Sequence, residues 1–424
     1  MAVLTYRTFI ENNARWLGGG FILTFASSFG QTFFISLFGG EIRGAFDLSH
    51  GGFGTIYAAG TLASAATLIW LGKFADEMRV AHLSALVLVG LAIACLTMSL
   101  AGSVVLLCLA IYLLRLMGQG MLLHIAMTAM GRWFSAHRGR AVGVVGLGLP
   151  LGEALLPFVT ILLIGAVGWQ QVWAGSALFL LFVILPVSWF LFQIPRTPTG
   201  EVETPMARAD NVHAPRDWTR AEVLRDPVFY GLLPGLLAPA FITTGIFFHQ
   251  VHLMDEKAWD ITTLPAVFPF FAAASVLSAL VSGWLIDRWN AVVFLPLFLL
   301  PLGLAVFLIA VVPAAIIAPV FMILSGMTVG MMKTISGALW PELYGVRHLG
   351  AVRSVTVALA VFATALAPGI VGLLADIGVT MSAQMLAMAA YTLVVSGVLW
   401  HVMRVIQAAR TGAISGPSEP TGST

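Results

Sequence analysis

Charged residues are scarce in this sequence: Asp, Glu, Lys and Arg make up 9% of its 424 residues, whereas 59% are hydrophobic. Soluble proteins carry about 25% charged residues, so the composition excludes a soluble chain. Cysteine is nearly absent as well. Cys95 and Cys108 both lie in apolar runs, which excludes a disulfide framework and predicts no metal site. No basic face interleaved with aromatic residues occurs, so we expect no nucleic-acid partner.

Signatures of catalysis are also missing. The sequence has no nucleotide-binding loop, so ATP-driven transport is not expected, and we expect no cofactor. Neither an HExxH motif nor a serine–base arrangement occurs in the apolar runs, which argues against an enzyme. The first fifteen residues are polar with mixed charge, and the apolar run that follows is long enough to span a bilayer, so we do not expect a cleavable signal peptide.

Long apolar runs dominate the sequence. A membrane-spanning helix needs about 20 mostly apolar residues. Twelve stretches meet that length or come close to it, and they define an all-α membrane protein with twelve transmembrane helices. The predicted spans are 17–38, 52–71, 82–100, 104–130, 141–164, 169–193, 228–252, 264–285, 291–311, 315–338, 351–374 and 380–403.

The distribution of Lys and Arg predicts the orientation, because cytoplasmic loops are enriched in these residues. With the N-terminus on the cytoplasmic side, seventeen of the 21 basic residues fall in cytoplasmic segments. Arg43 and Lys257 fall on the opposite side, and Arg115 and Lys333 fall inside spans. We therefore predict a multi-pass protein of the plasma (inner) membrane with both termini in the cytoplasm.

The spans form two halves. Residues 1–193 and 228–404 each hold six spans, 194–227 form a polar cytoplasmic linker with a short interfacial helix or an extended loop, and 405–424 form a disordered cytoplasmic tail. Gly72 and Asp76 recur as Gly283 and Asp287, and Pro157 recurs as Pro368, all at an offset of 211. Halves that repeat in the same order form a parallel repeat that encloses a cavity at the membrane midplane.

Several motifs strengthen this interpretation. They are the two G-x-x-x-D elements, Arg115 within RLMGQG, and RWFSAHRGRAVG at the entry to the fifth span. Together they resemble the major facilitator superfamily, and within it the branch of monocarboxylate transporters and oxalate/formate antiporters. The resemblance implies alternating access by two six-helix halves. The chain departs from that branch in its eighth span, which carries no basic residue.

The repeated G-x-x-x-D elements predict a cytoplasmic gate, because a carboxylate at a span end can interact with a helix N-terminus and a nearby Arg. We expect Asp76 to face Arg353, and Asp287 to face Arg138 or Arg140; the alternative is ordinary loop charge. The predicted gate comprises Gly72, Asp76, Arg79, Arg138, Arg140, Gly283, Asp287, Arg288 and Arg353.

Ionisable residues inside spans are costly and therefore indicate a functional site. Arg115 and Glu153 both lie about 17 Å deep, because each is about 11 residues from a span end at about 1.5 Å per residue. A functional pair, a static structural pair, or an unpaired Glu153 that carries a proton all fit this depth. Further candidates for contact with substrate or protons are Gln31, Tyr57, His124, Lys333 and His249.

Two of these candidates have competing interpretations. His124 fits a hydrogen-bonded packing histidine as well as a cavity residue. His249 and His252 lie one turn apart, but no third ligand is evident, so a vestibule or interface role is favoured over a metal site.

The sequence therefore predicts a monomeric secondary active transporter, a symporter or an antiporter, for a small organic anion such as a monocarboxylate. Protons are the expected coupling ion and the lipid bilayer the expected surroundings. In this scheme Arg115 attracts the anion, and Glu153 either couples transport to a proton or releases the anion by competing for Arg115. One alternative is efflux of amphipathic, drug-like compounds. Another, from a different class, is a membrane sensor that keeps the fold without transport.

Overall fold

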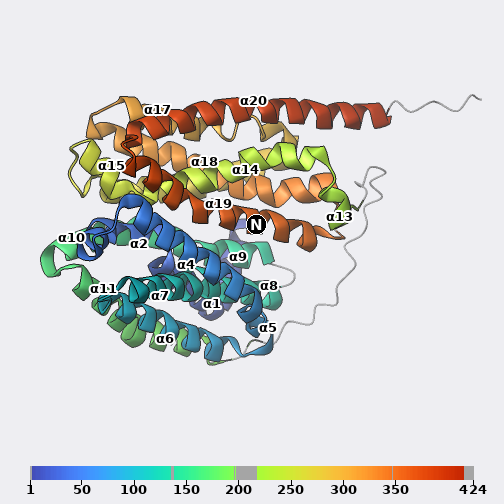
Figure 1. Cartoon of the computed structure of the whole chain (residues 1–424). Helices are drawn as coiled ribbons and strands as arrows, with labels where there is room; N and C mark the ends of the chain where they lie inside the picture. The colour runs from blue at the N-terminus through green and yellow to red at the C-terminus, as the bar shows by residue number, and fades with distance from the viewer. Residues whose placement is uncertain (1, 135–137, 195, 197–216, 346, 415–424) are drawn as a thin grey trace, which may run out of the picture.

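The protein is built almost entirely of helices. The computed structural model describes residues 2–134, 138–194, 196, 217–345 and 347–414, and within these ranges it contains no β-strand. Helices satisfy their backbone polar groups internally, which is why apolar sequence of this kind adopts them in lipid. The helices form two groups that lie side by side, the blue-to-green N-terminal half and the yellow-to-red C-terminal half (Figure 1).

The N-terminal half holds helices α1 to α12. Their bounds, with the intervening 3₁₀ and π segments, are α1 Ala2–Ala26, η1 Ser27–Gly30, α2 Thr32–Ile35, η2 Ser36–Phe38, α3 Gly39–Phe46, α4 His50–Leu71, α5 Phe74–Glu77, α6 Val80–Ser99, α7 Val104–Leu113, η3 Leu114–Leu122, α8 Leu123–Trp133, α9 Arg138–Gly146, α10 Gly148–Val167, α11 Trp169–Phe179, η4 Leu180–Ile184 and α12 Leu185–Phe192.

The C-terminal half repeats this course. Its elements are α14 Pro227–Phe248, α15 Gln250–Glu256, α16 Thr263–Trp289, η5 Val292–Phe294, α17 Leu300–Val311, η6 Ala315–Ile317, α18 Ala318–Tyr344, α19 Leu349–Asp376 and α20 Met381–Ile414. In the linker the described part contains one short helix, α13 Arg220–Val223.

Ten helical segments of the described chain are long and apolar enough to cross a membrane. An eleventh span is a pair of helical segments, Arg7–Gly30 and Thr32–Phe46, bent by 45°. The ninth predicted span contains a helix of only twelve residues, Leu300–Val311. Residues 295–299 before it are turns, and they include Pro296, which has no N–H to donate. The twelve predicted spans thus each correspond to a helical or partly helical segment.

Large apolar side chains cover the outside of the bundle. Ile69, Phe182 and Leu280 are 79%, 73% and 69% exposed. Contiguous apolar surface of this kind is a liability in water and is expected where a protein faces hydrocarbon. The interior is packed with aromatic and branched side chains, such as Phe34 and Trp173, which are fully buried.

The two halves approach each other closely where α4 meets α19. A Cβ at Gly54 would lie 2.4 Å from the backbone oxygen of Pro368, closer than any side chain could tolerate. Glycine at this position therefore lets two helix backbones pack directly, as small residues do between membrane helices.

Hydrogen bonds close the same end of the bundle. The Asp376 carboxylate, at the last residue of α19, accepts from the backbone N–H of His50 at 3.0 Å and of Gly51 at 2.9 Å. These two residues begin α4. A carboxylate of the C-terminal half therefore caps the start of a helix in the N-terminal half. We call this end, where His50, Gly51 and Asp376 meet, the sealed end.

The opposite end carries the linker, and we call it the linker end. A capping box starts α13: the Thr219 N–H donates to Glu222 Oε2 at 2.8 Å, and the Glu222 N–H donates back to Thr219 Oγ1 at 3.4 Å. Trp218 donates its backbone N–H to the oxygen of Tyr344, the last residue of α18, at 3.0 Å. The short helix thus contacts the C-terminal half; its interfacial role remains a prediction.

Candidate functional site

A cavity of about 350 Å³ lies between the two halves, and we call it the central cavity. Its wall is formed by the broken first span, α10, α14, α16, α18 and α19. The wall is mostly apolar and includes four phenylalanines. Its polar and charged members are Gln31, Thr32, Glu153, Thr243, Thr244, Lys333 and Thr364.

Two opposite charges face the central cavity from different halves. Glu153 lies on α10 in the N-terminal half, one turn before Pro157, and Lys333 lies on α18 in the C-terminal half. The charge that acts on Glu153 is that of Lys333. Among the described residues the two form no direct ion pair. An anionic group could therefore enter between them without first breaking a salt bridge.

The first span breaks where it reaches the central cavity. Helix α1 gives way to the 3₁₀ turn η1, and Gln31 then takes an extended conformation with φ −85° and ψ 155°. The break places Gln31 and Thr32 on the cavity wall. Thr32 Oγ1 shares a hydrogen bond of 2.6 Å with the Tyr57 hydroxyl. Discontinuous spans of this kind commonly line transporter binding sites.

Arg115 holds this break in place from behind the wall. Its side chain is 2% exposed, and its Nη1 donates to Gly30 O at 3.1 Å and to Thr32 Oγ1 at 3.5 Å. The guanidinium lies 5.1 Å from the centre of the Tyr57 ring, a favourable cation–π arrangement. Arg115 is also the second residue of the π-helical segment η3, and such segments are frequent at functional sites.

The structure does not bring Arg115 and Glu153 together. Within the described chain Arg115 makes no ion pair with Glu153 and does not line the central cavity. They lie on helices that turn them toward different neighbours. Arg115 points at the first span, whereas Glu153 faces the cavity and Lys333. Contact between Arg115 and the cavity therefore runs through Thr32.

The remaining candidates lie elsewhere. His124 Nε2 lies 3.0 Å from Gly72 O, at the end of α4, so its observed contact is one of helix packing. His249 lies at the sealed end, where its Nε2 donates to Pro368 O at 2.9 Å. Tyr57 is fully buried and reaches the cavity wall only through Thr32.

The predicted cytoplasmic gate falls partly outside the described residues. The side chains of Asp76, Arg138 and Asp287 belong to that undescribed part, so the expected carboxylate–arginine contacts remain predictions. Arg353 is exposed at the start of α19. The Arg288 guanidinium lies 5.5 Å from the centre of the Trp289 ring.

The other gate positions lie within the described residues. Gly72 packs against His124, and a Cβ at Gly283 would lie 3.9 Å from Thr334 on α18. Arg79 lines a separate cavity of about 420 Å³ at the linker end. Arg140 is half-buried on α9.

Sequence reasoning missed part of the cavity wall. Thr243 and Thr244 of α14 and Thr364 of α19 face the central cavity. Neighbouring threonines within an apolar span are a signal that could have found the first two. Thr364 is the position that the repeat aligns with Glu153, so the two halves place matching positions on one wall.

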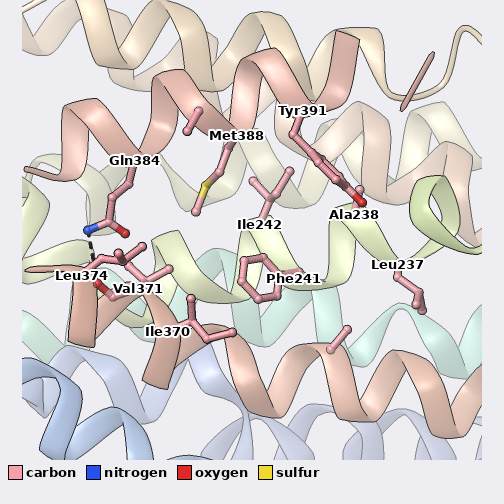
Figure 2. A pocket seen from close by; sticks show the side chains of 12 residues that line it. Leu237, Ala238, Phe241, Ile242, Ile370, Val371, Leu374, Gln384, Met388 and Tyr391 are labelled. Atoms are coloured by element: carbon pink, nitrogen blue, oxygen red, sulfur yellow. Dashed lines mark hydrogen bonds between the residues drawn. The ribbon is translucent and has the colours of Figure 1, made fainter. Parts of the chain in front are cut away.

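A second cavity of about 430 Å³ lies between α14, α19 and α20 and is almost wholly apolar (Figure 2). Its lining includes Phe241, Ile370 and Met388 and contains no charged residue. Gln384 donates its amide to Val371 O at 3.2 Å (Figure 2). Without charges from both halves, this cavity is a weaker candidate than the central cavity for recognising a polar solute.

Comparisons with known proteins agree with this fold. The family model of the Major Facilitator Superfamily matches residues 20–368. The fold is similar to that of a bacterial homolog of the human lysosomal transporter Spinster in an inward-facing, unoccupied conformation, with a TM-score of 0.70, 17% identity and coverage of 95% of this chain and 98% of that one. It is also similar to the nucleoside transporter NupG, with a TM-score of 0.66, 14% identity and coverage of 91% and 98%. No curated protein sequence matches significantly.

Proposed function

The chain belongs to the Major Facilitator Superfamily and is a secondary transporter, and we propose that it carries a small organic anion with coupling to protons. One observation carries the proposal: a carboxylate and an ammonium group face one cavity from opposite halves. A solute held by both halves changes its contacts when they rock, which is how binding is linked to alternating access.

Lys333 is the group we propose as the anion anchor. It is the basic residue on the wall of the central cavity, and an ammonium–carboxylate hydrogen bond is stronger than a neutral one. The surrounding phenylalanines and threonines would accept the apolar and polar parts of a small carboxylate. Lys333 thus takes the role that the sequence alone assigned to Arg115.

Glu153 is the group we propose for proton coupling. When no anion is bound, its carboxylate balances the charge of Lys333 across the cavity. When an anion binds Lys333, a second negative charge nearby becomes unfavourable, so Glu153 takes up a proton. Binding of the anion and of the proton therefore support each other.

Orientation and gating complete the proposal. The excess of Lys and Arg supports a cytoplasmic linker end and two cytoplasmic termini. Closure at the sealed end and likeness to an inward-facing transporter support a cavity that releases its solute toward the linker end. Asp76 and Asp287 are the proposed gate carboxylates of the opposite state. Arg115 is proposed to position Thr32 rather than to touch the solute.

Binding and flux measurements test these roles separately. In a thermal-shift screen of small monocarboxylates, the one that binds should raise the apparent stability of the native protein, because a ligand of the folded state stabilises that state. Lys333→Gln should abolish that shift. The matched control, Lys73→Gln, removes an exposed lysine outside the cavity and should keep it. A full shift in Lys333→Gln would refute the anchor.

Coupling is tested in proteoliposomes with Glu153→Gln. We expect uptake driven by a proton gradient to be lost while anion exchange continues, because a neutral Gln mimics the protonated state permanently. Gradient-driven uptake at the wild-type rate would exclude Glu153 as the coupling group. Binding without any flux in the wild-type protein would instead support the sensor.

The aromatic wall favours one second candidate, efflux of amphipathic compounds. Phe33, Phe247 and Phe268 face the central cavity and could stack on a hydrophobic cation. For that function, the expected effects of substituting Glu153 and Lys333 on solute binding are the reverse of those expected for an anion. A cation would depend on Glu153 and would bind equally well or better in Lys333→Gln, so this pair of variants distinguishes the two solute classes.

A further inference from the structure

Three histidines gather at the sealed end from both halves. His50 begins α4, His249 ends α14, and His252 lies on α15. The ring centres of His50 and His252 are 4.0 Å apart, and those of His50 and His249 are 5.8 Å apart. The cluster therefore bridges the interface that must separate if the cavity opens at this end.

The protonation state of His50 follows from its partner. Nη1 of Arg43 lies 3.1 Å from Nε2 of His50. A guanidinium can only donate hydrogen bonds, so Nε2 accepts and carries no proton in this state. A proton on Nε2 would remove the acceptor and place two cations against each other. The closed conformation thus requires a neutral His50.

His50 also takes part in the contacts that hold the two halves together at the sealed end. Its backbone N–H donates to Asp376 Oδ1 at 3.0 Å, and a Cβ at Gly372 would lie 2.5 Å from its backbone oxygen. A displacement of His50 would therefore disturb both the hydrogen bond and the close backbone packing that hold α4 against α19.

We propose that His50 is a proton-binding site that opens the sealed end. A proton arriving at Nε2 from the compartment at that end converts the Arg43–His50 hydrogen bond into repulsion. The repulsion displaces His50 and thereby weakens the contacts that hold α4 against α19. The inference goes beyond the transport of an organic anion. It requires only that the two halves move, and it concerns a proton site distinct from Glu153.

Other charged groups face the cluster and set the direction of the response. Arg43, His249 and His252 oppose a positive charge on His50, and Asp376 favours it. The acidic residues near His252 are Asp255, Glu256 and Asp376. Glu256 favours a positive charge on His252, and Arg43 opposes it. Because the contact with Arg43 opposes a proton on His50 only while the sealed end is closed, proton uptake at falling pH favours the open state.

A distance measurement tests the proposal without any solute, so its failure is separable from failure of the anion assignment. Spin labels at Ala45→Cys on α3 and Ile377→Cys beyond α19 report on the two halves at exposed positions. A Cys108→Ala background leaves only the buried Cys95. The distance distribution is compared in lipid nanodiscs at about pH 7.5 and about pH 5.5, which bracket histidine titration.

We expect a longer-distance population at the lower pH. At pH values between the pKa of His50 in the closed state and its pKa in the open state, the open-to-closed ratio should rise about tenfold for each unit by which the pH falls. His50→Gln keeps an acceptor for Arg43 but cannot be protonated, so it should stay closed at both pH values. The matched control His401→Gln, on an exposed part of α20, should respond as the wild type does.

Two outcomes would overturn the proposal: an unchanged distance distribution in the wild type, or a full pH response in His50→Gln. If His50→Gln does not fold, Arg43→Gln provides the second test. It removes the cation that repels protonated His50, so the pH response must shrink. A full response in Arg43→Gln would overturn the mechanism.

Discussion

The first span and its counterpart in the second half, the seventh, behave differently. Helix α14 runs unbroken from Pro227 to Phe248 although Pro234 and Pro239 lie inside it. The first span has no proline at its break, yet it leaves helical geometry between η1 and α2. The break is therefore stabilised by tertiary contacts rather than by a proline, and these include the hydrogen bond from Arg115 and the close packing of Gly30 on Gly118.

The two halves also differ in charge. The N-terminal half contributes Glu153 to the central cavity and the C-terminal half contributes Lys333, from helices that do not correspond in the repeat. A symmetric scaffold thus carries an asymmetric site. The first half contributes the carboxylate and the broken span to the cavity. The second half contributes the cation.

Of the variants that test this comparison, Arg115→Met should cause the largest loss of uptake. The substitution keeps an apolar stem but leaves Gly30 O without its donor. A hydrogen bond to a charged group contributes about 1.5–3 kcal/mol, so we expect uptake in proteoliposomes to fall at least about tenfold. Thermal stability should fall too.

The control for this variant is Arg7→Met. Arg7 forms an exposed ion pair with Glu11, 2.8 Å apart, and exposed pairs contribute at most about 1 kcal/mol. Uptake by Arg7→Met should equal that of the wild type. Wild-type uptake by Arg115→Met would show that the break in the first span does not depend on Arg115.

The next test moves the carboxylate from one half to the other. In a His50→Gln background, which removes the proposed pH response of the sealed end, Glu153→Thr should abolish the remaining pH dependence of uptake. Adding Thr364→Glu to Glu153→Thr should restore it in part. The reason is that both positions line the central cavity, so either carboxylate can lie near Lys333. Uptake is measured across about pH 5 to about pH 8, a range that covers the titration of a carboxyl group in apolar surroundings.

A folded double variant without any recovery would mean that the position of the carboxylate on α10 matters, not merely its presence in the cavity. Thr364→Glu alone is the matched control. It adds a second carboxylate to a wall that already has one, and we expect weaker anion binding because like charges repel.

The fold could be predicted from the sequence because hydropathy reports span length directly. The shortness of the ninth span could not be predicted: turns occupy residues 295–299, whereas composition alone indicates a continuous apolar run, and prolines such as Pro239 lie inside intact helices elsewhere. The break at Gln31 was not predicted, because the sequence identified Gln31 only as a candidate for contact with substrate or protons. Its geometry depends on Gly30 and Gly118, whose backbones touch: a Cβ at Gly30 would lie 2.8 Å from Gly118 Cα.

The site was predicted in part for a similar reason. Sequence position fixes the depth of a residue in the membrane, so Arg115, Glu153 and Lys333 were identifiable as intramembrane charges. Depth does not fix the direction in which a side chain points around its helix. Glu153 and Lys333 are 180 residues apart in the sequence, and only packing between the halves brings them to one cavity.

The smallest expected effect comes from the contact that joins the buried arginine to the cavity. Thr32→Val removes the hydroxyl that bonds Tyr57 at 2.6 Å and accepts from Arg115. A neutral hydrogen bond contributes about 1 kcal/mol, so uptake should fall about fivefold. Tyr57→Phe removes the same bond from the other side and should cause a similar loss of uptake.

If the hydroxyls of Thr32 and Tyr57 act only through each other, the double variant should be no worse than either single one. Additive losses in the double variant would instead show that Thr32 contacts the solute directly.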